Sequence, residues 1–284
     1  MKLHRHFLAV SLALLASPVL VGAASYEWTF NGGNLNDAFV NGSMTAVGAT
    51  TPNIVTTNGT TIPHVGGVAA QVLNVPAFTS ASDGFNLAFN ASGANGGSAA
   101  YINQYTLLFD LYSPGAPGWQ ALFNTNPGNA NDADWYIAPD NSLGIGSSYS
   151  APNAFPQATW TRVAFAADLA ANRISFYING TQVAQMLTGS LFDGRWSLFS
   201  NVDAGDDVRL FNEGDTSGDY THQLYVNSVA FVDRELSAQE VGALGGANAV
   251  GILVPEPGIG ALCGLAVAGL SGFGRPTRKR RLTQ

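Results

Sequence analysis

The alternation of apolar and polar residues between positions 160 and 183 predicts three consecutive antiparallel strands. Val163 and Phe165 alternate with polar or small residues, and a second alternating run extends from Ile174 to Ile178. A period of two is what a strand with one buried face requires. Asn179-Gly180 then supplies the two positive-φ residues of a tight type I′ hairpin. The pattern indicates a β-meander, with a generic hairpin as the simpler alternative.

Similar patterns predict strands on both sides of this meander. Segment 101–112 is the strongest, and because both of its faces are apolar we expect a central strand with 119–123 as its partner. Segment 222–233 is another long strand, with Tyr225 and Phe231 on one face, and we expect it to close the sheet. Shorter strands are expected at 26–30, 43–47, 54–57, 67–75, 135–137, 143–146 and 208–211.

One short helix is predicted near residue 240. Ser237 and Glu240 form a capping box, in which their side chains satisfy each other's backbone N–H groups, and the helix ends before Gly245-Gly246. The fold class is therefore all-β, a two-sheet antiparallel β-sandwich with one short C-terminal helix. We expect its core to contain Phe109, Phe165, Phe176, Ile178 and Phe231.

The order of the segments resembles a known family. The runs YINQYTLLFD, WQALFNTNPGNANDADWYI, LGIG, WTRVAFAADL and FYING, then DGRW and DRELSAQEVGALGG, are similar to laminin-G-like domains of the concanavalin A-like lectin and glucanase superfamily. The similarity runs from about 101 to 246 and is specific only as a combination. It implies a laminin-G-like jelly roll over residues 25–246, and it names no ligand.

The first 24 residues have the pattern of a signal peptide. A basic start precedes an apolar run from Phe7 to Leu15, and small residues offer a cleavage site before Ser25. A buried helix is the alternative. At the other end of the body, residues 247–253 are expected to form a linker.

Residues 254–284 resemble a PEP-CTERM sorting tail. About 17 mostly apolar residues, 258–274, barely suffice to cross a hydrocarbon core, and a basic cluster after them stays cytoplasmic. The resemblance implies a membrane sorting enzyme as partner and a transient anchor; a permanent single-span anchor is the alternative. The motif is Val254, Pro255, Glu256 and Pro257, and the basic end contains Arg275, Arg278, Lys279, Arg280 and Arg281.

The charge and the cysteine content of the chain indicate the cellular compartment in which it functions. Between residues 25 and 254 the chain has five arginines, no lysine and eighteen carboxylates, a net charge of −13. Such a surface repels nucleic acid and anionic lipid. The only cysteine, Cys263, lies in the tail, so the body forms no internal disulfide, which suits a bacterial envelope protein with a large core. We expect an exported protein of the cell surface or extracellular matrix.

The sequence of the body lacks the usual hydrolase motifs. It contains neither an E-x-D-x-x-E pattern of laminarinase-like enzymes nor a G-x-S-x-G nucleophile elbow. Glu235 and Glu240 belong to the helix cap and the helix, which gives them a structural role. His64 is expected to be an exposed or capped histidine and not a ligand. We therefore predict no enzymatic activity. A hydrolase would need two carboxylates that long-range folding brings together.

Two loops are rich in the oxygen ligands that calcium prefers. Neither loop has EF-hand spacing, so solvated acidic loops are the alternative. The first loop contains Asn129, Asn131, Asp132 and Asp134. The second, which is the better candidate for calcium, contains Asp203, Asp206, Asp207, Asn212, Glu213 and Asp215.

Aromatic residues flank the first of these loops. A sugar ring stacks on an exposed aromatic face beside amides or carboxylates, so this segment is a candidate glycan site; burial of the aromatics in the core is the alternative. We expect a module that binds a glycan or a surface protein. The alternatives are a structural matrix component without a pocket and a hydrolase. The candidate ligand-binding residues are Trp119, Asn131, Asp132, Asp134, Trp135 and Tyr136.

Overall fold

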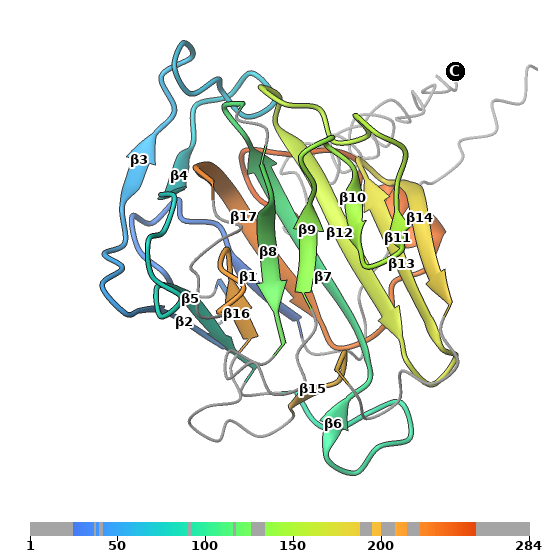
Figure 1. Ribbon diagram of the computed structural model, residues 1–284. Helices are drawn as coiled ribbons and strands as arrows, with labels where there is room; N and C mark the ends of the chain where they lie inside the picture. The colour runs from blue at the N-terminus through green and yellow to red at the C-terminus, as the bar shows by residue number, and fades with distance from the viewer. Residues whose placement is uncertain are drawn as a thin grey trace, which may run out of the picture. The chain divides into compact units, whose positions relative to one another are not determined.

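The protein folds as two antiparallel β-sheets that pack face to face (Figure 1). The computed structural model describes residues 25–36, 38–39, 42–89, 92–115, 118–125, 134–187, 195–199, 208–214 and 222–253. The all-β, two-sheet sandwich predicted from the sequence is confirmed. The predicted signal peptide and sorting tail lie outside the described residues. Among the described residues, no helix has the length and hydropathy needed to cross a membrane.

Sheet A has eight strands, in the order β14-β13-β12-β7-β17-β4-β3, and β1 pairs with β17 off this path. The predicted meander is confirmed as β12, β13 and β14, with positive φ at Asn179 and Gly180 in the last turn. The strands are β1 (Ser25–Trp28), β3 (Ile54–Thr56), β4 (Gln71–Val75), β7 (Gln104–Tyr112), β12 (Thr161–Asp168), β13 (Arg173–Ile178), β14 (Thr181–Leu187) and β17 (Leu224–Val232).

Sheet B has seven strands, in the order β11-β10-β9-β8-β16-β5-β2, and its strands β8 to β11 form the front layer in Figure 1. A separate two-stranded pair joins β6 (Tyr101–Ile102) to β15 (Leu198–Phe199). The strands of sheet B are β2 (Ser43–Val47), β5 (Gly84–Ala88), β8 (Gln120–Asn124), β9 (Asp134–Ile137), β10 (Leu143–Ile145), β11 (Ser148–Tyr149) and β16 (Val208–Leu210).

Three strand predictions were wrong. β8 is not the partner of β7, because the chain changes sheets between them and β8 pairs with β9 and β16. β17 does not close the sheet but lies between β7 and β4. Tyr225 faces away from Phe231, because a bulge between Val226 and Ser228 shifts the register and inverts the alternation.

The core between the sheets is built largely from aromatic rings. Phe165 packs edge-on against Phe123 with ring centroids 4.8 Å apart, and its ring also contacts Trp135 and Phe176 at 5.5 and 5.6 Å. All five residues predicted to meet in the core belong to this cluster, so that prediction is confirmed. The core fixes the inward face of every strand and leaves alternate side chains on the outer faces.

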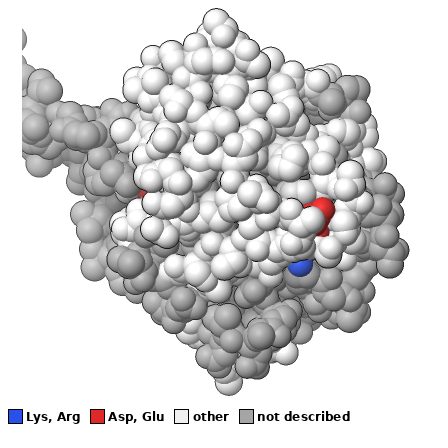
Figure 2. All heavy atoms as spheres, turned by 90° about the vertical axis from the view of Figure 1, so that its left-hand side faces the viewer, with Lys and Arg blue, Asp and Glu red and all other residues white. Residues whose placement is uncertain are grey.

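Among the described residues, one side of the sandwich carries very few charges. Residues 38–82 contain no Asp, Glu, Lys or Arg, and this stretch supplies the edge strands β2 and β3. Figure 2 shows that side of the molecule, where nearly all described atoms belong to uncharged residues. A ligand that approaches this side therefore meets hydroxyl and amide groups and very few ions.

The helix α1 (Ala238–Leu244) packs over the outer face of sheet A. Its predicted capping box is confirmed: the Glu240 N–H donates to the Ser237 hydroxyl and the Ser237 N–H donates to the Glu240 carboxylate. Leu236 and Val241 are buried there against the outward side chains of sheet A. The helix thus anchors the last described segment of the chain to the sandwich.

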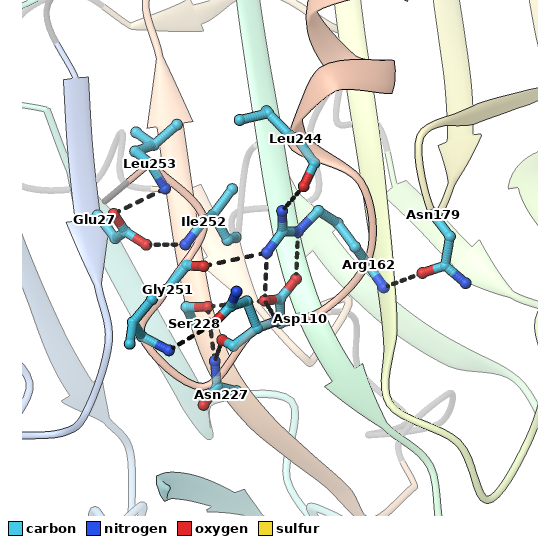
Figure 3. A network of polar contacts seen from close by, with 12 residues as sticks. Glu27, Asp110, Arg162, Asn179, Asn227, Ser228, Leu244, Gly251, Ile252 and Leu253 are labelled. Carbon is cyan, nitrogen blue, oxygen red and sulfur yellow. Dashed lines mark hydrogen bonds and ion pairs between the residues drawn. The ribbon is translucent and has the colours of Figure 1, made fainter. Parts of the chain in front are cut away.

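A buried polar network fastens residues 244–253 to the same face (Figure 3). Arg162 forms a bidentate pair with Asp110, at 2.7 and 2.8 Å, and also donates to the Gly251 carbonyl at 3.2 Å. The Glu27 carboxylate accepts the backbone N–H groups of Ile252 and Leu253. Residues 247–253, expected to be a linker, are therefore packed on sheet A.

Candidate functional site

Three aromatic side chains gather on the outer face of sheet B. Trp135 and Ile137 point into the core, so Tyr136 between them points outward. Tyr136 on β9 and Tyr149 on β11 both pair with Gly144 on β10. The two tyrosines therefore lie in one row across the sheet, with the glycine between them. Trp119 contacts both tyrosines edge-on, with ring centroids at 5.7 and 6.1 Å, and so bridges them across the glycine.

Trp119 differs from the other tryptophans in its exposure. Its side chain is 38% exposed, whereas the remaining four tryptophans of the chain are buried. Neighbouring residues hold it in place. A Cβ at Gly118 would lie within 2 Å of the His222 ring, so the chain can pass this close only with glycine there, and Gln120 accepts the His222 N–H. The indole is therefore a fixed, accessible surface.

Two carboxylates converge beside this cluster. The Tyr136 hydroxyl donates to Glu213 at 2.8 Å, and the Asp134 carboxylate also interacts with it. Burial, Asp134 and Glu213 raise the pKa of the Tyr136 hydroxyl well above its usual range, so it stays protonated and acts as a donor. Asn124 in turn donates its amide to the Glu213 carbonyl. Each group in the site is thus oriented by a neighbour.

The second tyrosine is also kept neutral. Burial, with the nearby charges of Asp140 and Asp134, raises the pKa of Tyr149 to about 12. Neutral phenol groups beside an indole suit a ligand that presents hydroxyl groups and an apolar ring face. The arrangement therefore favours stacking and hydrogen bonding over ion pairing.

The structure unites residues that the sequence placed in two separate candidate sites. Tyr136 and Asp134 come from the candidate glycan site, whereas Glu213 comes from the candidate calcium site. Trp135 belongs to the core, where its ring packs against Phe165, so it offers no face to a ligand. The other predicted members, Asn131 and Asp132, lie outside the described residues.

The calcium hypothesis rests mainly on undescribed residues. Of its six residues only Asn212 and Glu213 are described, and the described part of the chain contains no group of three or more His, Cys, Asp or Glu side chains arranged to hold a metal ion. The Asn212 amide donates to the carbonyls of Ser80 and Asp83, and its oxygen accepts the Gly214 N–H. This side chain thus has a structural role. Asp203, Asp206, Asp207 and Asp215, with Asn129 of the first loop, lie outside the described residues.

Sequence reasoning missed Tyr149 and Gly144. A signal was present, because Gly146 follows a short apolar run and could have marked a tight hairpin that returns Tyr149 to the outer face. The convergence of Glu213 with Tyr136 carried no such signal, since 77 residues separate them.

Comparisons with solved structures support the fold. The binding domain of Paraclostridial Mosquitocidal Protein 1 matches 77% of this chain with a TM-score of 0.50 and 11% identity. The match covers about half (51%) of the Mosquitocidal Protein chain. The chain has a β-sandwich fold of that kind. A weaker likeness is domain 4 of AbnA, an extracellular GH43 arabinanase from Geobacillus stearothermophilus solved with arabinotriose, with a TM-score of 0.47 and 16% identity over 78% of this chain and 97% of that chain. Another is the CBM40 of Ruminococcus gnavus IT-sialidase bound to α2,3-sialyllactose, with a TM-score of 0.39 and 16% identity over 51% of this chain and 83% of that chain. No protein-family model and no curated protein matches the sequence.

Proposed function

We propose that this protein is a non-catalytic binding module that holds a glycan against the outer face of sheet B. The observation that carries the proposal is Trp119, the single exposed tryptophan, fixed between Tyr136 and Tyr149. A pyranose ring stacks on such a surface through its C–H face. Glu213 and Asp134 hold the Tyr136 hydroxyl in a fixed orientation at the edge of this surface.

Binding should depend on the Trp119 ring and not on exposed aromatic surface in general. A glycan array, run with calcium and with a chelator, identifies the ligand, and calorimetry then compares variants. We expect Trp119→Ala to weaken binding about tenfold or more, since stacking contributes about 1.5 kcal/mol. Phe39→Ala is the matched control, because Phe39 is equally exposed (39%) but lies between β1 and β2. Unchanged binding by Trp119→Ala would refute the proposed site.

A glycan hydrolase is the second candidate, and the convergence of Asp134 and Glu213 at Tyr136 favours it. Glycosidases act through two carboxylates on either side of the bond that breaks. Our proposal predicts that a bound oligosaccharide is recovered intact. Release of new reducing ends, abolished by Glu213→Gln, would establish the hydrolase instead.

We further propose that the protein is exported and sorted to the cell surface or matrix. The support is the sequence alone: the signal-peptide pattern, the Val254-Pro255-Glu256-Pro257 motif, the apolar run and the basic end. In this proposal the partner of the tail is a membrane sorting enzyme, and the membrane anchor is temporary.

A further inference from the structure

A cavity of about 440 Å³ opens beside the outer face of sheet A, on the sheet opposite to Trp119. Its volume lies in the range of roughly 300 to 1,000 Å³ that small ligands occupy in proteins. Segments distant in the sequence form its walls, namely 63–67, 158–160 and 246–247, together with Asn179. None of these residues belongs to the candidate site on sheet B.

Glycines keep the mouth of the cavity open. Val65 and Val68 exchange two backbone hydrogen bonds of 3.0 Å, and Gly66 and Gly67 between them have φ of 57° and 83°, as a type I′ turn requires. A Cβ on Gly66 would come within 3.8 Å of the Ala247 carbonyl, so the hairpin tip and this segment face each other closely. Side chains at these positions would narrow the entrance.

His64 is one of the residues that line this cavity. The Ala70 N–H donates to the Thr57 hydroxyl oxygen at 3.0 Å, and the same hydroxyl group is hydrogen-bonded to the His64 Nδ1 at 3.1 Å. This bond holds the imidazole ring in place. Nε2 lies beside Gly59, where a Cβ would stand 3.1 Å away, and it has no partner among the described residues.

Asn179 supplies a hydrogen-bond donor at the cavity. Its side-chain oxygen accepts the Arg162 N–H at 2.9 Å, which fixes the orientation of the amide. The Nδ2 group then retains both hydrogens, and no described residue accepts them. Gly246 lies directly alongside, since a Cβ there would be 3.4 Å from the Asn179 oxygen. The cavity therefore offers one amide donor of fixed orientation and, from another segment, the imidazole ring of His64.

The remaining lining is uncharged and partly apolar. The indole of Trp160 donates its N–H to the Pro63 carbonyl at 2.7 Å, so its ring contributes apolar surface. Ala158 and Ala247 add methyl groups, and no Asp, Glu, Lys or Arg occurs among the described residues of the lining. A charged ligand would find no counter-ion here, whereas a neutral ligand with a carbonyl oxygen and a methyl group fits both kinds of surface.

We propose that this cavity is a second binding site, which accepts one N-acetylated neutral sugar residue. The acetamido oxygen accepts from Asn179 Nδ2 beside the His64 ring, and the acetamido methyl group packs on the Trp160 and Ala158 side. The site is independent of the proposed function at Trp119, because the two lie on opposite sheets.

Histidine NMR on the full chain tests the proposal. The chain has four histidines, and the Hε1 signals of His64 and His222 report on the two sides of the sandwich. Methyl N-acetyl-β-glucosaminide, titrated to tens of millimolar, should shift the His64 signal saturably and leave that of His222 in place. His64→Gln assigns the signal. An unmoved His64 signal at the end of the titration would overturn the proposal.

Three variants and one second probe complete the test. Thr159→Tyr places a bulky group at the exposed rim and should weaken binding about tenfold or more, whereas Thr51→Tyr, an exposed threonine outside the lining, should have no effect. Trp119→Ala should leave the His64 titration unchanged. Methyl glucoside, which lacks the acetamido group, should bind more weakly. An equal response to both sugars, or a shift that survives Thr159→Tyr, would refute the assignment.

Discussion

At the scale of single residues, burial changes what an ionisable group does. Glu27 is fully buried beneath residues 252 and 253, and its carboxylate accepts their backbone N–H groups. Desolvation is the largest influence and raises the pKa of Glu27 to about 7, although these hydrogen bonds and the charge of Arg162 lower it. From the sequence, Glu27 is only a polar position within an alternating strand, because the segment that buries it lies more than 200 residues away.

The raised pKa predicts a specific dependence of stability on pH. Between the ordinary value of 4.5 and about 7, folded Glu27 binds a proton that the unfolded chain does not. The free energy of unfolding should therefore increase as the pH falls through this window, by up to about 3 kcal/mol. Urea unfolding of the wild type and of Glu27→Gln measures the effect, and the variant should lack this increase.

Below that window, the stability depends on a different group. Arg234 and the Ser237 cap lower the pKa of Glu240 to about 2, so its contribution to stability is lost only below about pH 4.5. The two effects are therefore separable in one titration. Parallel curves for wild type and Glu27→Gln between pH 4.5 and 7 would contradict the prediction.

At the scale of secondary-structure elements, alternation predicted which residues face the core but not which strands pair. The meander could be predicted because its turns are formed by residues close together in the sequence, such as Asn179-Gly180. The pairing of β8 with β16 could not be predicted, because it joins segments that are distant in the sequence. The inversion at Tyr225 arose from one bulge, which polar and apolar spacing does not encode.

The short hairpin of β10 and β11 depends on a glycine. A Cβ on Gly144 would lie 2.1 Å from the Ser148 carbonyl oxygen and 2.7 Å from the Tyr149 Cα, both on the backbone. Gly144→Ala should therefore separate the strands, displace Tyr149 from Trp119, and cost on the order of 1 to 3 kcal/mol of stability. Thermal unfolding and glycan titration test both effects.

The matched control is Gly93→Ala. An added Cβ meets no described atom within 4 Å at that position, so stability and binding should stay close to those of the wild type. Full glycan binding by Gly144→Ala would show that Tyr149 takes no part in the site.

At the scale of the whole molecule, charge is unevenly distributed. The body has a net charge of −13, yet residues 38–82 contain no Asp, Glu, Lys or Arg. Composition predicted an acidic protein, but only the fold shows that very few charged atoms lie among the described residues on one side (Figure 2). Likewise the sequence showed two of the aromatic residues of the candidate site, Trp119 and Tyr136, whereas the contact of Tyr136 with Glu213 depends on the folded structure.

The calcium hypothesis predicts a change in thermal stability. If the stretch 203–215 binds calcium only in the folded state, millimolar calcium should raise the melting temperature by mass action. Magnesium, which prefers fewer ligands in a stricter geometry, should do so less. The double variant Asp206→Asn, Asp207→Asn should lose the response. An unchanged melting temperature of the wild type in calcium would remove the hypothesis.

The sorting hypothesis predicts a defined C-terminus for the mature protein. Two prolines disfavour helical structure around Glu256 and leave an extended peptide that a processing enzyme can hold. Mass spectrometry of the mature protein should find no peptide beyond Pro257. Recovery of the peptide with Arg278 to Arg281 from the mature form would identify a permanent anchor.

The clamp of Glu27 on the last described residues also determines where a mechanical load enters the fold. A pull on the chain at Leu253 reaches β1 through the Glu27 carboxylate, and β1 is joined to β17 along four residue pairs. β17 is in turn bonded to β7 at the centre of sheet A. Tension applied from this end therefore enters sheet A through β1 and the central strand β17, and not through the edge strands β3 and β14.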